Sequence, residues 1–192
     1  MRLTLAAAIF SLAVPAYADT FVPDPGHTEI LVAWNHAGFS IQTAKFHQVE
    51  GTLELDQEDV EAAKAEFTVA VSSIDTGVEA LDGHLQSGDF FDASNHPSVT
   101  FVSTGIEMTG EKTAKITGDL TIKDVTNPVT FDVVIHNIGA HPVGQFFDYY
   151  KGEWLGMTAT ATIKRSEWGM AAMVPVGSDE IEITINSEMK AQ

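Results

Sequence analysis

Asp82 and His84 are the two side chains in this sequence whose types and closeness could support acid–base chemistry. Positions i and i+2 of a helix do not face each other, so the pair could meet only if Gly83 interrupted the helix. One interpretation is therefore an acid–base dyad or a polar anchor for a ligand head group. The other, which we favour, is that each side chain ties a helix to neighbouring strands, because backbone groups at such junctions need hydrogen-bond partners.

The seven histidines do not have the spacing of metal ligands. His27, His36 and His47 are far apart along the chain, and neither H-x-H nor H-E-x-x-H occurs. The sequence also lacks a nucleophile elbow, a Walker loop and a dinucleotide fingerprint. It therefore predicts no catalytic residue, no cofactor and no metal site. The alternative is a metal site made of histidines that only the fold brings together.

Composition narrows the function classes further. The chain has 192 residues, no cysteine and a formal net charge of −17. Without cysteine there can be no disulfide framework, thiolate metal site or cysteine nucleophile. A strongly acidic surface repels phosphate backbones and anionic lipid head groups, which argues against nucleic-acid partners and against docking on a membrane through a basic face.

The first 18 residues have the features of a secretory signal peptide. Arg2 precedes an apolar run over residues 3–14, and Ala16-Tyr17-Ala18 has the small-x-small form of a cleavage site. The apolar run is too short to span a bilayer, so we expect no stable membrane insertion. We predict cleavage before Asp19, export, and a single domain over residues 19–192.

A short helix is expected near the middle of the chain. Thr76 and Glu79 have the spacing of a capping box, which satisfies free N–H groups at a helix start. Val78, Leu81 and Leu85 then fall on one helical face. Two adjacent aromatic residues follow, and the segment is typical of a plug or lid on a β-structure.

Most of the remaining chain alternates between apolar and polar residues with the period of a half-buried strand. The pattern is clear over residues 115–123 and 157–164. We count about eight such segments, mostly in hairpin order, with the helix between the third and the fourth. This favours an all-β fold, an antiparallel up-and-down barrel, because closure removes exposed strand edges.

The interior of such a barrel is either filled by side chains or wide enough for one small ligand. The small residues Gly118, Ala159 and Ala161 stand on apolar strand faces and favour a cavity. Large residues opposite them could equally fill the space. The candidate ligand-binding residues are Trp34, Phe67, Val69, Val71, Phe90, Phe91, Phe101, Gly118, Leu120, Ile122, Phe131, Met157, Ala159 and Ala161.

The connection over residues 139–156 is rich in aromatic residues. It contains Phe146, Phe147, Tyr149, Tyr150 and Trp154. Such a loop can line a ligand mouth at a barrel end. Packing as a separate cluster under the loop is the commoner fate of these residues.

Several motifs carry a resemblance to the YceI-like family. They are SIDTG (73–77), DFFD (89–92), HPSVTF (96–101), TGDLTIKDVTNPV (117–129) and TATIKRSEWGM (160–170). The resemblance covers nearly all of the chain after residue 20. It implies a lipocalin-like barrel in the periplasm that binds a polyisoprenoid or a similar amphiphilic lipid.

Two residues of the expected helix depart from that family pattern. Leu81 and Gln86 stand where the family commonly has basic residues. Burial of a long apolar tail must therefore supply the affinity of a lipid carrier. The alternatives are a lipid-acting enzyme that uses Asp82 and His84, and a core-filled barrel that serves as a stress or interaction protein.

Overall fold

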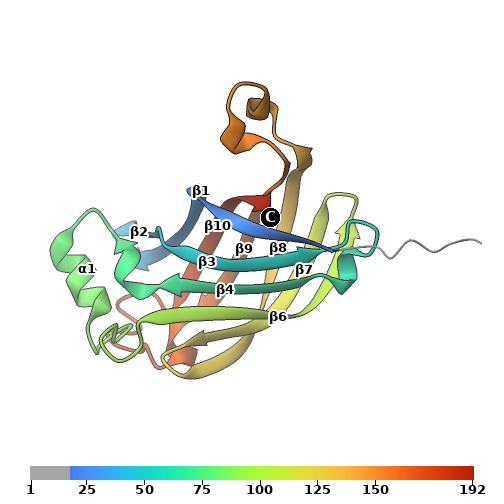
Figure 1. The fold of residues 1–192 in the computed structure, drawn as a ribbon. Coiled ribbons are helices and arrows are strands. Elements are labelled where there is room, and N and C mark those ends of the chain that lie inside the picture. The colour runs from blue at the N-terminus through green and yellow to red at the C-terminus, as the bar shows by residue number, and fades with distance from the viewer. Residues whose placement is uncertain (1–17) are drawn as a thin grey trace, which may run out of the picture.

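The computed structural model describes residues 18–192. The predicted signal peptide lies outside the described residues except for its last position, so cleavage before Asp19 stays a prediction. Figure 1 shows a strongly curved sheet of strands with the helix α1 at one end.

The described part of the chain forms ten antiparallel strands in one sheet. They are β1 (Asp19–His36), β2 (Ser40–Phe46), β3 (Val49–Leu55), β4 (Lys64–Ala70), β5 (Ile74–Asp75), β6 (Ser98–Gly110), β7 (Thr113–Ile122), β8 (Val125–Ala140), β9 (Glu153–Lys164) and β10 (Glu180–Ala191). Pairing of β10 with β1 closes the sheet into a barrel.

Ten strands occupy eight positions around the barrel because two positions are divided. β2 and β3 lie end to end along β1, which pairs with β2 through residues 30–36 and with β3 through residues 19–21. In the same way β5 pairs with β2, and β4 pairs with β3. The prediction of an eight-stranded antiparallel barrel is confirmed.

The helix α1 (Glu79–Gln86) lies between β5 and β6, which are the third and fourth barrel positions, as predicted. The predicted capping box at Thr76 and Glu79 is wrong. Val78 is the N-cap residue and makes no side-chain cap bond. Thr76 instead bonds to Asp82 one turn into the helix, and Gly83 lies inside α1 without interrupting it.

Five short 3₁₀ segments complete the described structure. They are η1 (Val60–Ala62), η2 (Val71–Ser73), η3 (Pro142–Gln145), η4 (Asp148–Tyr150) and η5 (Arg165–Trp168). Of these, η3 and η4 belong to the loop between β8 and β9, orange in Figure 1, which projects from the barrel well apart from α1.

One region of the interior is filled by apolar side chains. Phe21 and Met189 are fully buried there, and they pack with Leu53, Leu55 and Leu155. A second cluster, around Phe46, packs against α1 and the residues that follow it. Residues of both clusters, among them Met189 and Phe46, line a hollow in the barrel.

Candidate ligand-binding cavity

A cavity of about 450 Å³ occupies the barrel interior. Every one of the eight barrel positions contributes apolar side chains to its wall, and α1 contributes Leu81 and Leu85. A volume of this size lies within the range of about 300–1,000 Å³ that is typical of small-molecule sites. The arrangement can exclude water from an apolar ligand over most of the ligand surface.

Most of the candidate residues line this cavity. The structure places on its wall Trp34, Phe67, Val69, Phe90, Phe91, Phe101, Leu120, Ile122, Phe131, Met157 and Ala159. Alternation along each strand brings them to the same side of the sheet, because successive side chains point to opposite faces.

Val71, Gly118 and Ala161 are not on the wall. Val71 falls in η2, where the strand alternation stops, and it is buried in the protein itself. Gly118 is covered by the ring of Phe101, which occupies the space that a side chain at position 118 would need. Ala161 is half-buried and packs against a third group of buried residues, which includes Phe131 and Ile163.

Asp82 is engaged in holding α1 in place. Its Oδ1 accepts hydrogen bonds from the Thr76 backbone N–H at 2.7 Å and from the Thr76 hydroxyl at 2.6 Å. Since Thr76 directly follows β5, these bonds tie the helix to the barrel. The structure thus pairs Asp82 with Thr76 and does not form the Asp82–His84 dyad.

His84, by contrast, lies on the cavity wall. Its ring meets the ring of Phe90 edge-on, with centroids 5.1 Å apart. Its Nε2 is 3.8 Å from Oδ2 of Asp89, at the solvent side. His84 is therefore a polar group at the helix end of an apolar cavity.

Sequence reasoning missed the loop between β9 and β10, which covers the same end of the cavity. Arg165 is 6% exposed, and its guanidinium donates to the carbonyls of Met170, Gly177 (3.2 Å) and Ser178 (2.8 Å). It also lies 5.5 Å from the ring centroid of Phe90. Burial lowers the pKa of Arg165, and the field of nearby Asp179 opposes that change.

Two further contacts hold this loop. Asp179 accepts hydrogen bonds from the Ser166 N–H at 2.9 Å and the Ser166 hydroxyl at 2.7 Å, and these bonds lower the pKa of Asp179. The buried indole of Trp168 donates to the carbonyl of Leu120 at 3.0 Å. The motif TATIKRSEWGM (160–170) runs into this loop, but nothing in its spacing indicated that the loop covers the cavity.

The aromatic loop between β8 and β9 contributes no side chain to the cavity wall as described. Tyr149, Tyr150 and Trp154 pack together with His141, at ring-centroid distances of 4.7–5.9 Å. The cluster interpretation therefore holds for Tyr149, Tyr150 and Trp154, whereas Phe146 and Phe147 are exposed, and the mouth interpretation is wrong.

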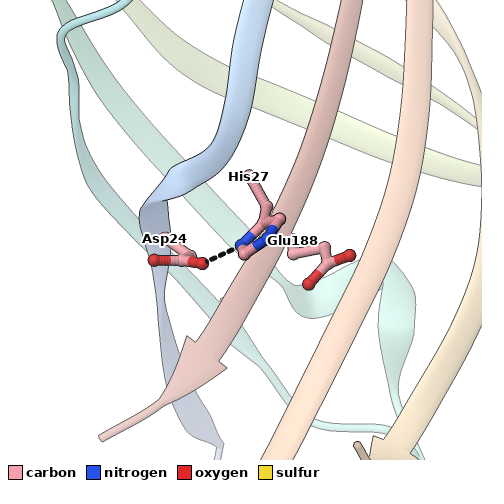
Figure 2. A group of neighbouring side chains, drawn as sticks. All are labelled: Asp24, His27 and Glu188. Carbon is pink, nitrogen blue, oxygen red and sulfur yellow. Dashed lines mark hydrogen bonds and ion pairs between the residues drawn. The ribbon is translucent and has the colours of Figure 1, made fainter. Parts of the chain in front are cut away.

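Beside this cluster the fold assembles a polar group that spacing along the chain did not predict. Asp24 and His27 of β1 lie next to Glu188 of β10 (Figure 2). Asp24 is 5% exposed, and its carboxylate accepts from the Tyr149 hydroxyl at 2.6 Å and the Gly26 N–H at 3.3 Å, and pairs with Nδ1 of His27.

Both members of this pair have altered pKa values. Burial acts to raise the pKa of Asp24, but hydrogen bonds from His27, Tyr149 and Gly26 outweigh it, so the pKa is lowered. The hydrogen bond to Asp24 raises the pKa of His27, and the charge of Glu188 adds to that effect. The geometry thus favours the charged forms of both groups.

The fold and the site define a class of protein: a single closed antiparallel barrel, filled in one region and hollow in another, with an apolar cavity under a short helix and a loop. Within the described residues, no helix combines the length and the apolar character needed to cross a bilayer.

The chain belongs to the YceI-like family, whose domain model matches residues 21–189. It is 33% identical to the UPF0312 protein of Pseudomonas aeruginosa strain LESB58 over 187 residues, which is 97% of this chain and 94% of that protein. It is 30% identical to protein YceI of Escherichia coli O157:H7 over 189 residues, which is 98% of this chain and 95% of that one.

Solved structures share the fold. BcnA of Burkholderia cenocepacia superposes with a TM-score of 0.75 at 22% identity, covering 86% of this chain and 98% of that one. A polyisoprenoid binding domain from Saccharophagus degradans superposes with a TM-score of 0.66 at 11% identity, covering 91% and 99%. The YceI protein of Campylobacter jejuni gives 0.69 at 26% identity, covering 82% and 89%.

Proposed function

We propose that this protein binds a long-chain apolar lipid, a polyisoprenoid or an isoprenoid quinone-like molecule, inside the barrel and carries it through the periplasm. The observation that carries the proposal is the apolar cavity of about 450 Å³. The likeness of the fold to a domain described as polyisoprenoid binding supports the same ligand class. The predicted signal peptide supports the compartment.

Burial of the lipid tail supplies enough free energy for useful affinity. Each methylene removed from water contributes about 0.8 kcal/mol, so a dozen carbons contribute on the order of 10 kcal/mol before the costs of association. Micromolar affinity requires about 8 kcal/mol. A tail can therefore bind without an ion pair at its head.

The polar groups of the wall suggest an orientation. Arg165 and His84 both lie against Phe90 at the helix end, and Met189 of the filled cluster lines the cavity elsewhere. We infer that the tail extends toward the filled cluster and that the head group lies near Arg165.

Binding is favoured over catalysis by the state of the acid–base candidates. Asp82 already accepts two hydrogen bonds from Thr76, and it is not on the cavity wall as described. A lipid-acting enzyme would need this carboxylate to face the ligand. We therefore propose a binding protein without enzymatic activity.

Native mass spectrometry of protein purified from its own periplasm tests the proposal. We expect a mass increment that disappears on extraction with organic solvent and that matches an isoprenoid lipid in the extract. Titration of the delipidated protein with a fluorescent isoprenoid should then show saturable binding. Protein that carries no lipid and does not bind the probe would contradict a carrier function.

A further inference from the structure

We propose a second site, a divalent transition-metal site suited to Zn²⁺, formed by Asp24, His27 and Glu188 on the outside of the barrel. It is independent of the lipid cavity, whose described wall contains none of these three residues. The site lies where β1 and β10 close the barrel (Figure 2). The aromatic loop is next to it, since the Tyr149 hydroxyl donates to Asp24.

The strand geometry places the three ligands together. The register of β1 against β10 shifts between Pro23 and Thr28, so Asp24 and His27 belong to a bulge of the closing strand pair. Pro25 within the bulge has no N–H to donate to a partner strand. Bulges redirect side chains, and this one turns Asp24 and His27 toward Glu188 of β10.

One ligand atom from each residue lies within 4.8 Å of the other two. A zinc ion needs nitrogen and carboxylate oxygen ligands at about 2.0–2.2 Å, which requires a small inward movement of the side chains. The His27 side chain is 45% exposed and can make that movement, whereas Asp24 is held by Tyr149 and Gly26. The cation takes the place of the proton in the hydrogen bond between Nδ1 of His27 and Asp24.

Glu188 supplies an independent observation that points to a ligand. Its Oε2 atom is buried and accepts no hydrogen bond from the described residues, while the Glu188 side chain as a whole is 37% exposed. Nε2 of His141 lies 3.4 Å away, and Nδ1 of His141 already accepts from the Val143 N–H. The nearest donor to this buried oxygen is therefore Nε2–H of His141, which makes no hydrogen bond to it, and a bound cation would give the oxygen a closer partner.

Local charge also favours a cation. Two carboxylates face one histidine, and the ammonium group of nearby Lys190 is directed elsewhere, to the Tyr149 carbonyl and over the Tyr149 and Trp154 rings. One imidazole nitrogen with two carboxylate oxygens suits zinc and similar transition metals, whereas calcium prefers oxygen ligands alone. Water can fill the fourth position.

Calorimetric titration of EDTA-treated mature protein with ZnCl₂, without an affinity tag, tests the site. We expect one zinc ion per chain and a rise in the melting temperature. Glu188→Gln and His27→Gln should each lower the affinity about tenfold or more. Thermal melts of both variants without metal report whether each is folded. If one variant does not fold, the other still tests the site.

His96→Gln is the matched control, because His96 lies near Asp92 and Asp124 in a separate histidine–carboxylate group. X-ray absorption of the zinc-loaded protein should show nitrogen and oxygen ligands. No zinc binding by wild type would overturn the proposal. So would unchanged binding by folded Glu188→Gln and His27→Gln, or loss of binding in His96→Gln.

Discussion

The ring of Phe101 in β6 lies directly against Gly118 in β7. A Cβ atom built at Gly118 would be 2.4 Å from Cζ of Phe101 and 2.5 Å from the carbonyl oxygen of Val102. The same ring meets Phe131 edge-on, with centroids 5.4 Å apart. Because glycine has no side chain, the Phe101 ring can lie over Gly118 and pack against Phe131 on the cavity wall.

Gly118→Ala should destabilise the protein. The added Cβ would meet two atoms of the Phe101 ring and the backbone oxygen of Val102, which cannot rotate away, so we expect overpacking to cost about 1–3 kcal/mol. Displacement of Phe101 should also weaken binding of an isoprenoid. Urea denaturation measures the first effect, and titration with a fluorescent probe measures the second.

Gly105→Ala is the control for this substitution, because a Cβ at Gly105 of β6 meets nothing within 4 Å. It should change the urea midpoint less than Gly118→Ala does. Equal midpoints for the two variants would mean that the Phe101–Gly118 contact does not constrain the wall.

Ala159→Phe should weaken binding with little loss of stability. Ala159 is 4% exposed and lies on the cavity wall, so a larger side chain can extend into empty space. The added ring then occupies volume that the lipid tail needs. Denaturant midpoint and affinity for a fluorescent isoprenoid are the two measurements.

Thr160→Phe provides a matched control on the same strand, because Thr160 is exposed and points outward. It should leave the affinity unchanged. A lowered midpoint for Ala159→Phe, with unchanged affinity, would mean that the interior behaves as a packed core and not as a binding site.

The sequence was sufficient for the architecture because alternation is a local property. It placed the helix and the strands, and most of the residues that it named lie on the cavity wall, since inward positions recur every second residue. The role of Gly118 could not be predicted in this way. That role depends on which residue of the neighbouring strand lies over it, and strand register is not visible in one strand alone.

The same limit applies to the polar sites. The Thr76 hydroxyl could accept from the backbone N–H of Glu79 or bond to a side chain further along the helix. Local spacing did not reveal that it bonds to the Asp82 carboxylate. Asp24 and Glu188 stand near opposite ends of the chain, and only closure of the barrel through β1 and β10 brings them together. The loop around Arg165 has no periodicity from which its position could be inferred.

Asp82→Ala should lower stability more than it lowers binding. It removes both hydrogen bonds from Thr76, and the loss of bonds to a charged acceptor should cost about 1–3 kcal/mol. His84→Ala should do the reverse, because His84 contacts the cavity and the ring of Phe90. Thermal melts and lipid titrations of both variants separate the two roles. Abolished turnover of a lipid substrate in Asp82→Ala, with unchanged melting, would favour an enzyme.

Arg165→Lys should loosen the loop between β9 and β10. The planar guanidinium donates to three carbonyls at once, whereas an ammonium group cannot match that geometry. We expect a loss of about 1–3 kcal/mol and faster release of a bound lipid, since Met170 and Gly177 line the cavity. Stopped-flow dissociation measures the release rate. A release rate and a midpoint equal to those of wild type would contradict this role.

The Asp24–His27 pair should make stability depend on pH at both ends of the range. The pKa of Asp24 is lowered from 3.8, so its contribution is present above that value and is lost as pH falls through the lowered pKa. The pKa of His27 is raised from 6.5, so its contribution is complete below that value and is lost as pH rises through the raised pKa.

Two variants separate the loss of stability at acid pH from the loss at alkaline pH. Their urea midpoints are measured in EDTA from about pH 3 to about pH 9. His27→Gln should lose less stability than wild type as pH rises above neutrality. Tyr149→Phe removes a hydrogen bond that lowers the pKa of Asp24, so its acid loss should begin at higher pH while its alkaline loss remains. If His27→Gln and wild type instead lose stability equally as pH rises, then protonation of His27 contributes no stability to the fold, because only a pKa that differs between the folded and unfolded states makes stability depend on pH.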